Sequence, residues 1–288
     1  MNFSFPETVS KINDSAFADC SWLSGSLIIP DGVTEIGPYA FYNCETISSL
    51  SLPIGLEKIS DYAFNWCKSI SGQLILPSSV MSIGNSAFAG CTNLSGSLIL
   101  PQGLTYLGSS AFGECIGFIG DLNIPESLKK IESGAFFGCR GLNGRLILHD
   151  GLELSPGSFS QSGFRGELVL PANITEIPAD CFSWVPFTSI AGFPDGLLGI
   201  GDYAFSNSAI SGKIELPESL VSLGSGAFYN SNFISELTIP ENLSIIKSQA
   251  FYQCFQLNKI VCKSINPPIL QWGAFDGVSK DNLQGPQL

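Results

Sequence analysis

The sequence is poor in charge and almost without histidine. Only 13% of its 288 residues are charged, and 25 Asp and Glu outnumber 13 Lys and Arg, so the formal net charge is -12. A nucleic-acid partner is not expected, because binding a phosphate backbone needs a dense basic surface. The same deficit argues against a polybasic contact with anionic lipid. The single histidine, His149, excludes a metal site built from several histidines.

Long hydrophobic runs and catalytic motifs are also missing. Apolar residues make up 44% of the chain but occur only in short runs, so no membrane insertion is expected. The first residues, MNFSFPETVSKIND, show no basic stretch followed by a long apolar run, so no signal peptide is visible. No G-x-S-x-G, P-loop or H-E-x-x-H motif occurs. We therefore expect no enzymatic activity, no cofactor and no metal, and we interpret His149 as a polar turn residue.

What the sequence does contain is one repeated pattern. A phenylalanine recurs every 23 or 24 residues, usually after an alanine, and a proline stands eleven residues before ten of the twelve phenylalanines. His149 takes the place of that proline in the seventh repeat. The twelve repeat phenylalanines are Phe17, Phe41, Phe64, Phe88, Phe112, Phe136, Phe159, Phe182, Phe205, Phe228, Phe251 and Phe275.

Each repeat predicts two short strands and one turn. An apolar-x-apolar triplet such as Leu98-Ile99-Leu100 stands before the proline, and this alternation is typical of a strand that the proline ends. We expect a second short strand three to six residues after the proline, and then a single helical or 3-10 turn that carries Ala-Phe. One repeat cannot bury its apolar side alone, so the repeats are predicted to stack in parallel with equivalent side chains in ladders.

The segment LSGSLILPQGLTYLGSSAFGEC, residues 94–115, resembles the BspA-like leucine-rich repeat. The resemblance covers residues 3 to about 275. It implies a right-handed repeat solenoid with a parallel sheet on its concave face and short turns on the return side. It also implies a surface or secreted protein of a host-associated bacterium, a role in adhesion, and no catalytic residues to carry over. We predict a single domain of about twelve repeats over residues 1–278, followed by a tail over residues 279–288.

Seven of the nine cysteines occupy one slot, three residues after the repeat phenylalanine. Other repeats place serine or valine there, as at Ser208 and Val185. Stacked neighbours would lie close enough for a disulfide, but the substitutions favour a buried, reduced packing residue. Cys181 and Cys262 fill apolar slots and are interpreted as core.

The candidate binding residues are those that strand alternation turns to solvent before each proline. Apolar side chains in that row would form an exposed patch of the kind that marks interaction sites. The alternative is that β-branched residues there only stabilise a parallel ladder. The candidates on the concave face are Ile28, Ile75, Ile99, Asn123, Arg145, Ile147, Val169 and Glu215.

The function predicted from these features is a non-enzymatic recognition or adhesion module. It would lie on the cell surface or be secreted, with its targeting segment outside this chain, and would bind a protein or glycan through the concave sheet. The alternative is a structural spacer of a larger envelope protein with no ligand of its own. Because Phe3-Ser-Phe-Pro6 already has the strand pattern, an end-to-end contact at an uncapped first repeat is also expected. The four tryptophans are expected to be half-buried on the return side or in turns.

Overall fold

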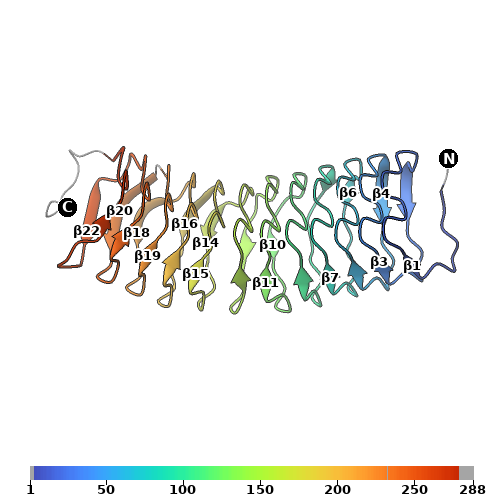
Figure 1. Cartoon of the computed structure of the whole chain (residues 1–288), viewed down its shortest axis with the longest axis horizontal. Coiled ribbons are helices and arrows are strands. Elements are labelled where there is room, and N and C mark those ends of the chain that lie inside the picture. Colours follow the sequence, from blue (N-terminus) through green and yellow to red (C-terminus); the bar gives the residue numbers. More distant parts are fainter. Residues whose placement is uncertain (1–2, 232, 279–288) are drawn as a thin grey trace. The chain divides into compact units, whose positions relative to one another are not determined.

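The structure, a computed structural model, is built from coils of short parallel strands (Figure 1). It describes residues 3–231 and 233–278. The chain divides into two compact units, Met1–His149 and Asp150–Leu288, and each is a parallel-sheet β-solenoid. The repeat solenoid predicted from the sequence is thus confirmed. A single domain over residues 1–278 stays a prediction, and the expected tail lies outside the described residues.

The N-terminal unit has two rows of strands. The strands just before the repeat proline, called here the pre-proline strands, are β2 (Gly25–Ile28), β4 (Ile47–Ser51), β6 (Gly72–Gln73), β8 (Leu94–Ser95), β10 (Leu122–Asn123) and β12 (Leu146–Ile147). The post-proline strands are β1 (Lys11–Ile12), β3 (Glu35–Ile36), β5 (Lys58–Ile59), β7 (Ser82–Ile83), β9 (Tyr106–Leu107) and β11 (Lys130–Ile131). Strands β1-β3-β5-β7-β9 form one parallel sheet, while β2-β4, β6-β8 and β10-β12 form pairs.

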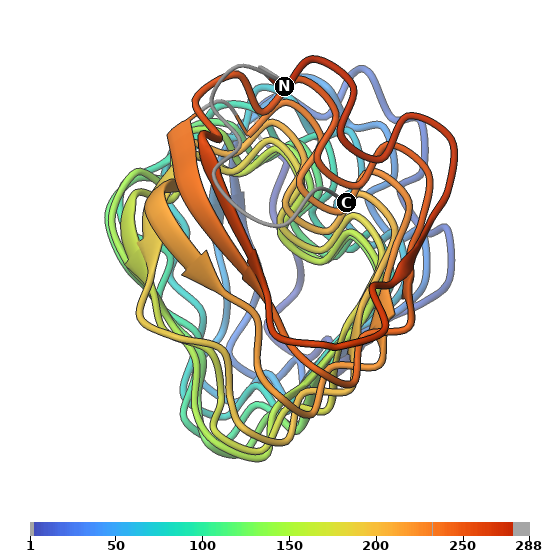
Figure 2. The same ribbon diagram turned by 90° about the vertical axis from the view of Figure 1, so that its left-hand side faces the viewer.

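The C-terminal unit repeats this arrangement, and Figure 2 shows its pre-proline strands on one side of the coils. Those strands are β14 (Gly166–Leu168), β16 (Phe187–Ile190), β18 (Ser211–Glu215), β20 (Phe233–Ile239) and β22 (Lys259–Cys262). Its post-proline strands are β13 (Glu153–Leu154), β15 (Glu176–Ile177), β17 (Gly199–Ile200), β19 (Ser222–Leu223), β21 (Ile245–Ile246) and β23 (Ile269–Leu270). Strands β15-β17-β19-β21-β23 and β18-β20-β22 form its larger sheets.

The core of each unit is a ladder of phenylalanine rings. In the N-terminal unit the ring centroids of Phe41 and Phe64 lie 5.2 Å apart with an interplanar angle of 6°. In the C-terminal unit the Phe228 and Phe251 rings are 5.3 Å apart and tilted by 3°. All four are fully buried. Equivalent side chains therefore stack in register in both units, as the repeat predicts.

The first ring of the N-terminal ladder is covered differently from the others. Phe3 and Phe5 pack edge-to-face on Phe17, with ring centroids 5.1 Å and 5.4 Å away. Phe17 remains partly exposed, whereas Phe41 in the next coil is fully buried. The end-to-end contact expected at the first repeat stays a prediction.

The return segment corrects one expectation, because the Ala-Phe turn is not helical. No α-helix or 3-10 helix occurs in residues 3–231 and 233–278. Tyr39 and Asn43, two residues before and after Phe41, have left-handed φ angles of 56°, and such residues interrupt a right-handed helix. Successive amides consequently alternate in direction. The Ala40 N–H donates to Gly37 in its own turn, at 3.2 Å, and the Phe41 N–H donates to Ala63 of the next coil, at 2.8 Å.

Candidate binding face

The pre-proline segments of the N-terminal unit present isoleucines to solvent. Leu27 and Ile29 are buried, while Ile28 between them is 65% exposed. The same alternation leaves Ile75 72% exposed and Ile99 66% exposed. Ser51 is the register partner of Ile28 on β4. We call Ile28, Ser51, Ile75 and Ile99, which fill equivalent positions in four consecutive repeats, the isoleucine stripe.

The remaining N-terminal candidates lie on β10 and β12 or beside them. Asn123 pairs in register with Ile147, and both are exposed. The Arg145 guanidinium lies 3.4 Å from the Asp121 carboxylate, whose Oδ1 also accepts the Arg145 backbone N–H at 2.7 Å. This backbone hydrogen bond is the main reason that the pKa of Asp121 is lowered. An exposed pair of this kind adds little stability.

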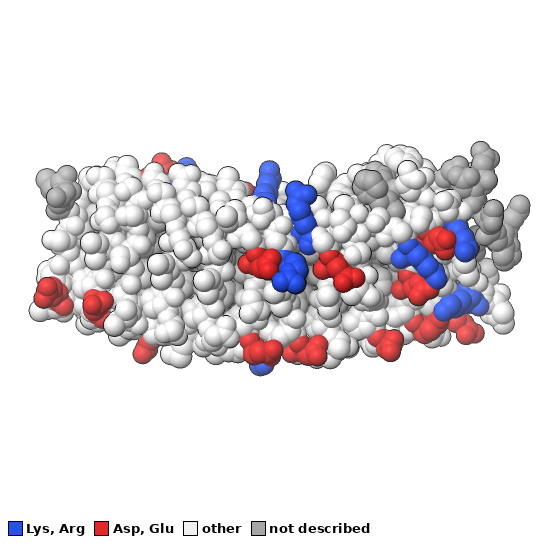
Figure 3. Space-filling model, turned by 180° about the vertical axis from the view of Figure 1, so that it is seen from behind, with Lys and Arg blue, Asp and Glu red and all other residues white. Residues whose placement is uncertain are grey.

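The candidates in the C-terminal unit have a different environment. Val169 is exposed, and Glu215 forms an ion pair with Lys213 on the same strand, β18. Lys213 is also in register with Glu236 on β20, which forms a 3.3 Å ion pair with Lys259. Figure 3 shows one face of the chain, on which basic and acidic side chains gather in groups and wide areas carry no charge. Strands β18, β20 and β22 thus carry charged side chains, whereas the residues of the isoleucine stripe are uncharged.

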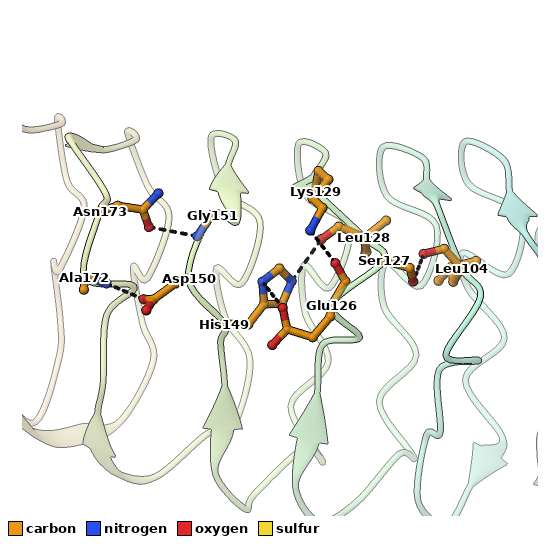
Figure 4. A network of polar contacts seen from close by, with 10 residues as sticks. All are labelled: Leu104, Glu126, Ser127, Leu128, Lys129, His149, Asp150, Gly151, Ala172 and Asn173. Carbon is orange, nitrogen blue, oxygen red and sulfur yellow. Dashed lines mark hydrogen bonds and ion pairs between the residues drawn. The ribbon is translucent and has the colours of Figure 1, made fainter.

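His149 is held by the turn of the repeat before it (Figure 4). Its side chain is buried; Nε2 lies 3.0 Å from the Leu128 carbonyl oxygen and Nδ1 lies 3.5 Å from the Glu126 carboxylate. In the same N-terminal unit the Ser127 hydroxyl donates to the Leu104 carbonyl at 2.6 Å. At the position where other repeats have proline, the imidazole therefore connects its turn to the turn of the preceding repeat.

The first turn of the C-terminal unit uses side chains in the same way. The carboxylate of Asp150 accepts the Ala172 N–H at 2.7 Å, and the Asn173 side chain accepts the Gly151 N–H at 2.8 Å (Figure 4). Each bond joins one repeat to the next. Asp150 thus belongs to the turn scaffold.

The cysteine slot has a function in the ladder that the sequence did not reveal. The Cys91 thiol donates to the carbonyl oxygen of Phe64, in the preceding repeat, at 3.1 Å. Ser231 makes the equivalent bond to Phe205 at 3.0 Å, which explains why serine can replace cysteine. All nine cysteines are free thiols. Burial raises the pKa of Cys91 and Cys139 to about 12, so these thiols are poor nucleophiles.

Sequence analysis also missed a group of aromatic side chains on the return segments. Tyr39, Tyr42, Tyr62 and Trp66 come from two consecutive repeats of the N-terminal unit, and we call them the turn-face aromatics. Tyr39 and Tyr62 stack with ring centroids 4.7 Å apart, and Tyr42 meets Tyr39 edge-on at 5.6 Å. The signal available in the sequence was their position two residues before, one after and two after the repeat phenylalanine.

Within residues 3–231 and 233–278, no group of three or more His, Cys, Asp or Glu residues is arranged to hold a metal ion. The described part of the chain also contains no helix that is long and apolar enough to cross a membrane.

Several solved structures share this fold. A leucine-rich repeat protein from Bacteroides ovatus is 24% identical, with a TM-score of 0.65 over 96% of this chain and 69% of that one. A leucine rich cell surface protein from Faecalibacterium prausnitzii is 23% identical, with a TM-score of 0.50 over 88% and 83%. The pneumococcal vaccine antigen PcpA is 18% identical, with a TM-score of 0.54 over 96% and 83%. At these identities the likeness shows the fold alone.

Sequence comparison identifies the family. No curated protein matches the chain. The family model of the BspA type leucine rich repeat region matches residues 1–75, 60–185 and 153–280, with 6 copies. These matches cover nearly all of the sequence and confirm the resemblance seen in the repeat motif. The chain therefore belongs to the BspA-type leucine-rich repeat family.

Proposed function

We propose that the chain is a non-enzymatic recognition module located on or outside a bacterial cell. Its ligand is a protein or glycan that binds to the outward face of the pre-proline segments in the N-terminal unit. The observation that carries this proposal is the isoleucine stripe, in which Ile28, Ile75 and Ile99 are each about two-thirds exposed. Exposed apolar surface of this kind marks interaction sites.

The surroundings of the stripe suit recognition. Asn123 and the Arg145–Asp121 pair provide hydrogen-bonding groups beside the apolar side chains. A binding face commonly combines an apolar centre with a polar rim. The surface location is supported by the proteins that share the fold, since one of them is named a cell surface protein and another a vaccine antigen.

The proposal is tested by placing charge on the stripe. Ile28, Ile75 and Ile99 are replaced together by lysine, and binding of the whole chain to immobilised extracellular-matrix proteins and to a glycan array is measured. The wild-type chain should bind at least one of these ligands. The triple variant should bind it at least about a hundredfold more weakly, because several buried lysines oppose an apolar contact.

The matched control puts three lysines on exposed apolar residues of the same unit that lie off the stripe, at Ile54, Met81 and Ile116. This control should bind as the wild type does, and circular dichroism should show that both variants are folded. Equal binding by the stripe variant and the wild type would contradict the proposal, and so would a wild type that binds nothing, which is the behaviour of a spacer.

A further inference from the structure

Three of the four turn-face aromatics lie on backbone that is unfavourable for them. Tyr39, Tyr62 and Trp66 have φ angles of 56°, 59° and 60°, in the left-handed region where a side chain with a Cβ atom is disfavoured and a bulky one most of all. In the equivalent slots several other repeats place small residues, among them Ser86 and Gly90. The N-terminal unit therefore has aromatic side chains where the same fold can be made with serine or glycine.

Core packing does not account for these side chains. The repeat phenylalanines Phe41 and Phe64 fill the interior and are fully buried, whereas Tyr39 is 40% exposed and Trp66 is 44% exposed. The Trp66 ring leans against the next coil, where a Cβ atom added to Gly90 would lie 2.8 Å from it. Unfavourable backbone that is kept for exposed side chains suggests a functional role.

The groups around the aromatic rings favour the binding of a cation. The Lys68 ammonium lies 5.1 Å from the centroid of the Trp66 ring and 2.6 Å from the Glu45 carboxylate. The chain's own cation thus occupies the space between an aromatic face and an acid, which is a cation–π arrangement. Asp19 in the preceding repeat, which accepts a 2.8 Å hydrogen bond from the Asn43 side-chain amide, and Asp61, next to Tyr62, add negative charge nearby.

We propose that the turn-face aromatics bind an arginine- and lysine-rich polypeptide segment of a partner protein. Guanidinium groups stack on tyrosine and tryptophan rings, and these two residues are enriched at the energetic centres of protein interfaces. The net charge of -12 attracts a basic segment, while the rings give it a defined place to dock. This surface is separate from the isoleucine stripe, so the inference does not depend on the proposed function.

The test uses the whole chain and a fluorescent nona-arginine peptide, with binding followed by anisotropy at about 150 mM salt, where long-range attraction is screened. The variant is Tyr39→Ser with Tyr62→Ser, since Ser86 shows that the slot accepts serine at a φ of 50°. This change leaves the net charge unaltered. Loss of two cation–π contacts should weaken binding about tenfold or more.

The matched control is Tyr203→Ser in the C-terminal unit, where the tyrosine also has a φ of 56°. It removes an equally strained tyrosine without touching the turn-face aromatics, and it should bind the peptide as the wild type does. Thermal unfolding should show that both variants are folded. If the double variant binds as tightly as the wild type, the attraction is due to acidic charge alone and the proposal is wrong. Absence of binding by the wild type, or binding of a neutral glycan array in place of the peptide, would overturn it as well.

Discussion

Truncation of one ring in the phenylalanine ladder is the perturbation whose effect the structure determines best. Phe112 is fully buried between Phe88 and Phe136, with ring centroids 5.5 Å and 5.8 Å away, and Phe118 meets it edge-on at 5.9 Å. Replacing Phe112 with alanine should destabilise the chain by about 3–5 kcal/mol. Loss of apolar burial accounts for about 1.5–3 kcal/mol, and the cavity and the lost ring contacts account for the remainder.

The cavity should persist because the backbone on both sides is fixed. The Phe112 N–H donates to the Ala135 carbonyl oxygen of the next coil at 2.9 Å, so the neighbouring coils cannot collapse into the space. Urea unfolding followed by circular dichroism measures the loss. Each coil contacts only its neighbours, so native-state hydrogen exchange should show the loss mainly in the N-terminal unit.

Phe255→Ala is the control for this prediction. Phe255 is an aromatic residue of the same size that is 54% exposed, and its truncation should change the stability by no more than about 0.5 kcal/mol. A loss below about 1 kcal/mol for Phe112→Ala, or equal losses for the two variants, would refute the ladder as the source of stability.

Three further predictions follow from the local geometry. Gly90→Ala should destabilise the chain by about 1–2 kcal/mol, because φ is 76° and the new Cβ would lie 2.8 Å from the Trp66 ring; a lower melting temperature and shifted tryptophan emission are expected, and a rise in melting temperature would contradict this. Two lysines beside Glu35 lower the pKa of its carboxyl group. The ion pairs of Glu35 therefore stabilise the fold at pH values above 4.5, the ordinary pKa of glutamate, and this stabilisation is lost as the pH falls through the lowered pKa. Glu35→Gln should therefore cost less than about 1 kcal/mol at neutral pH, and the difference from wild type in unfolding free energy should vanish in acid. Burial raises the pKa of Cys91 and Cys139 from 9.0 to about 12. The buried neutral thiols therefore contribute fully to the free energy of unfolding below pH 9.0, and this contribution is lost as the pH rises toward 12. In urea unfolding measured at increasing pH, Cys91→Ser should lose less stability at alkaline pH than the wild type. An equal loss in the two proteins would show that ionisation of the Cys91 thiol does not affect stability.

Most of the fold could be predicted from the sequence repeat. A period of 23 or 24 residues can be satisfied by a stack in which every Phe slot lies inside, and Phe64 and Phe205 are both fully buried. The apolar-x-apolar pattern likewise placed Ile99 outside and Leu98 and Leu100 inside, although these three residues lie beyond the end of β8 and not in a strand as expected. These features could be predicted because each follows from a pattern that recurs along the chain.

The return segment could not be predicted in the same way. Its short polar segment before Ala-Phe is compatible with a helical turn or with a series of tight turns, and the choice depends on hydrogen bonds to the next coil. The Phe64 N–H, for example, donates to the Ala87 carbonyl oxygen at 2.8 Å. The positions of the turn-face aromatics around the repeat phenylalanine could be seen in the sequence, but the left-handed backbone of Tyr62 and Trp66 could not.

The role of the cysteine slot could be predicted only in part from the sequence. Replacement by serine and valine indicated a small buried residue, but not the bond from the Cys67 thiol to the Phe41 carbonyl oxygen at 3.0 Å. That bond joins atoms 26 residues apart in the sequence. The serines in the slot were the available signal that a hydrogen-bond donor is preferred there.

Within each unit, successive repeats stack in register, with backbone hydrogen bonds running from each coil to the next. Amide hydrogen exchange measured residue by residue tests it most directly. The amides of Phe41 and Phe64 in one unit, and of Phe205 and Phe228 in the other, each donate to the next coil at 2.8 Å, and they should be among the slowest to exchange. Exchange of these amides at the rate of an unfolded chain would show that the coils are not joined by these hydrogen bonds.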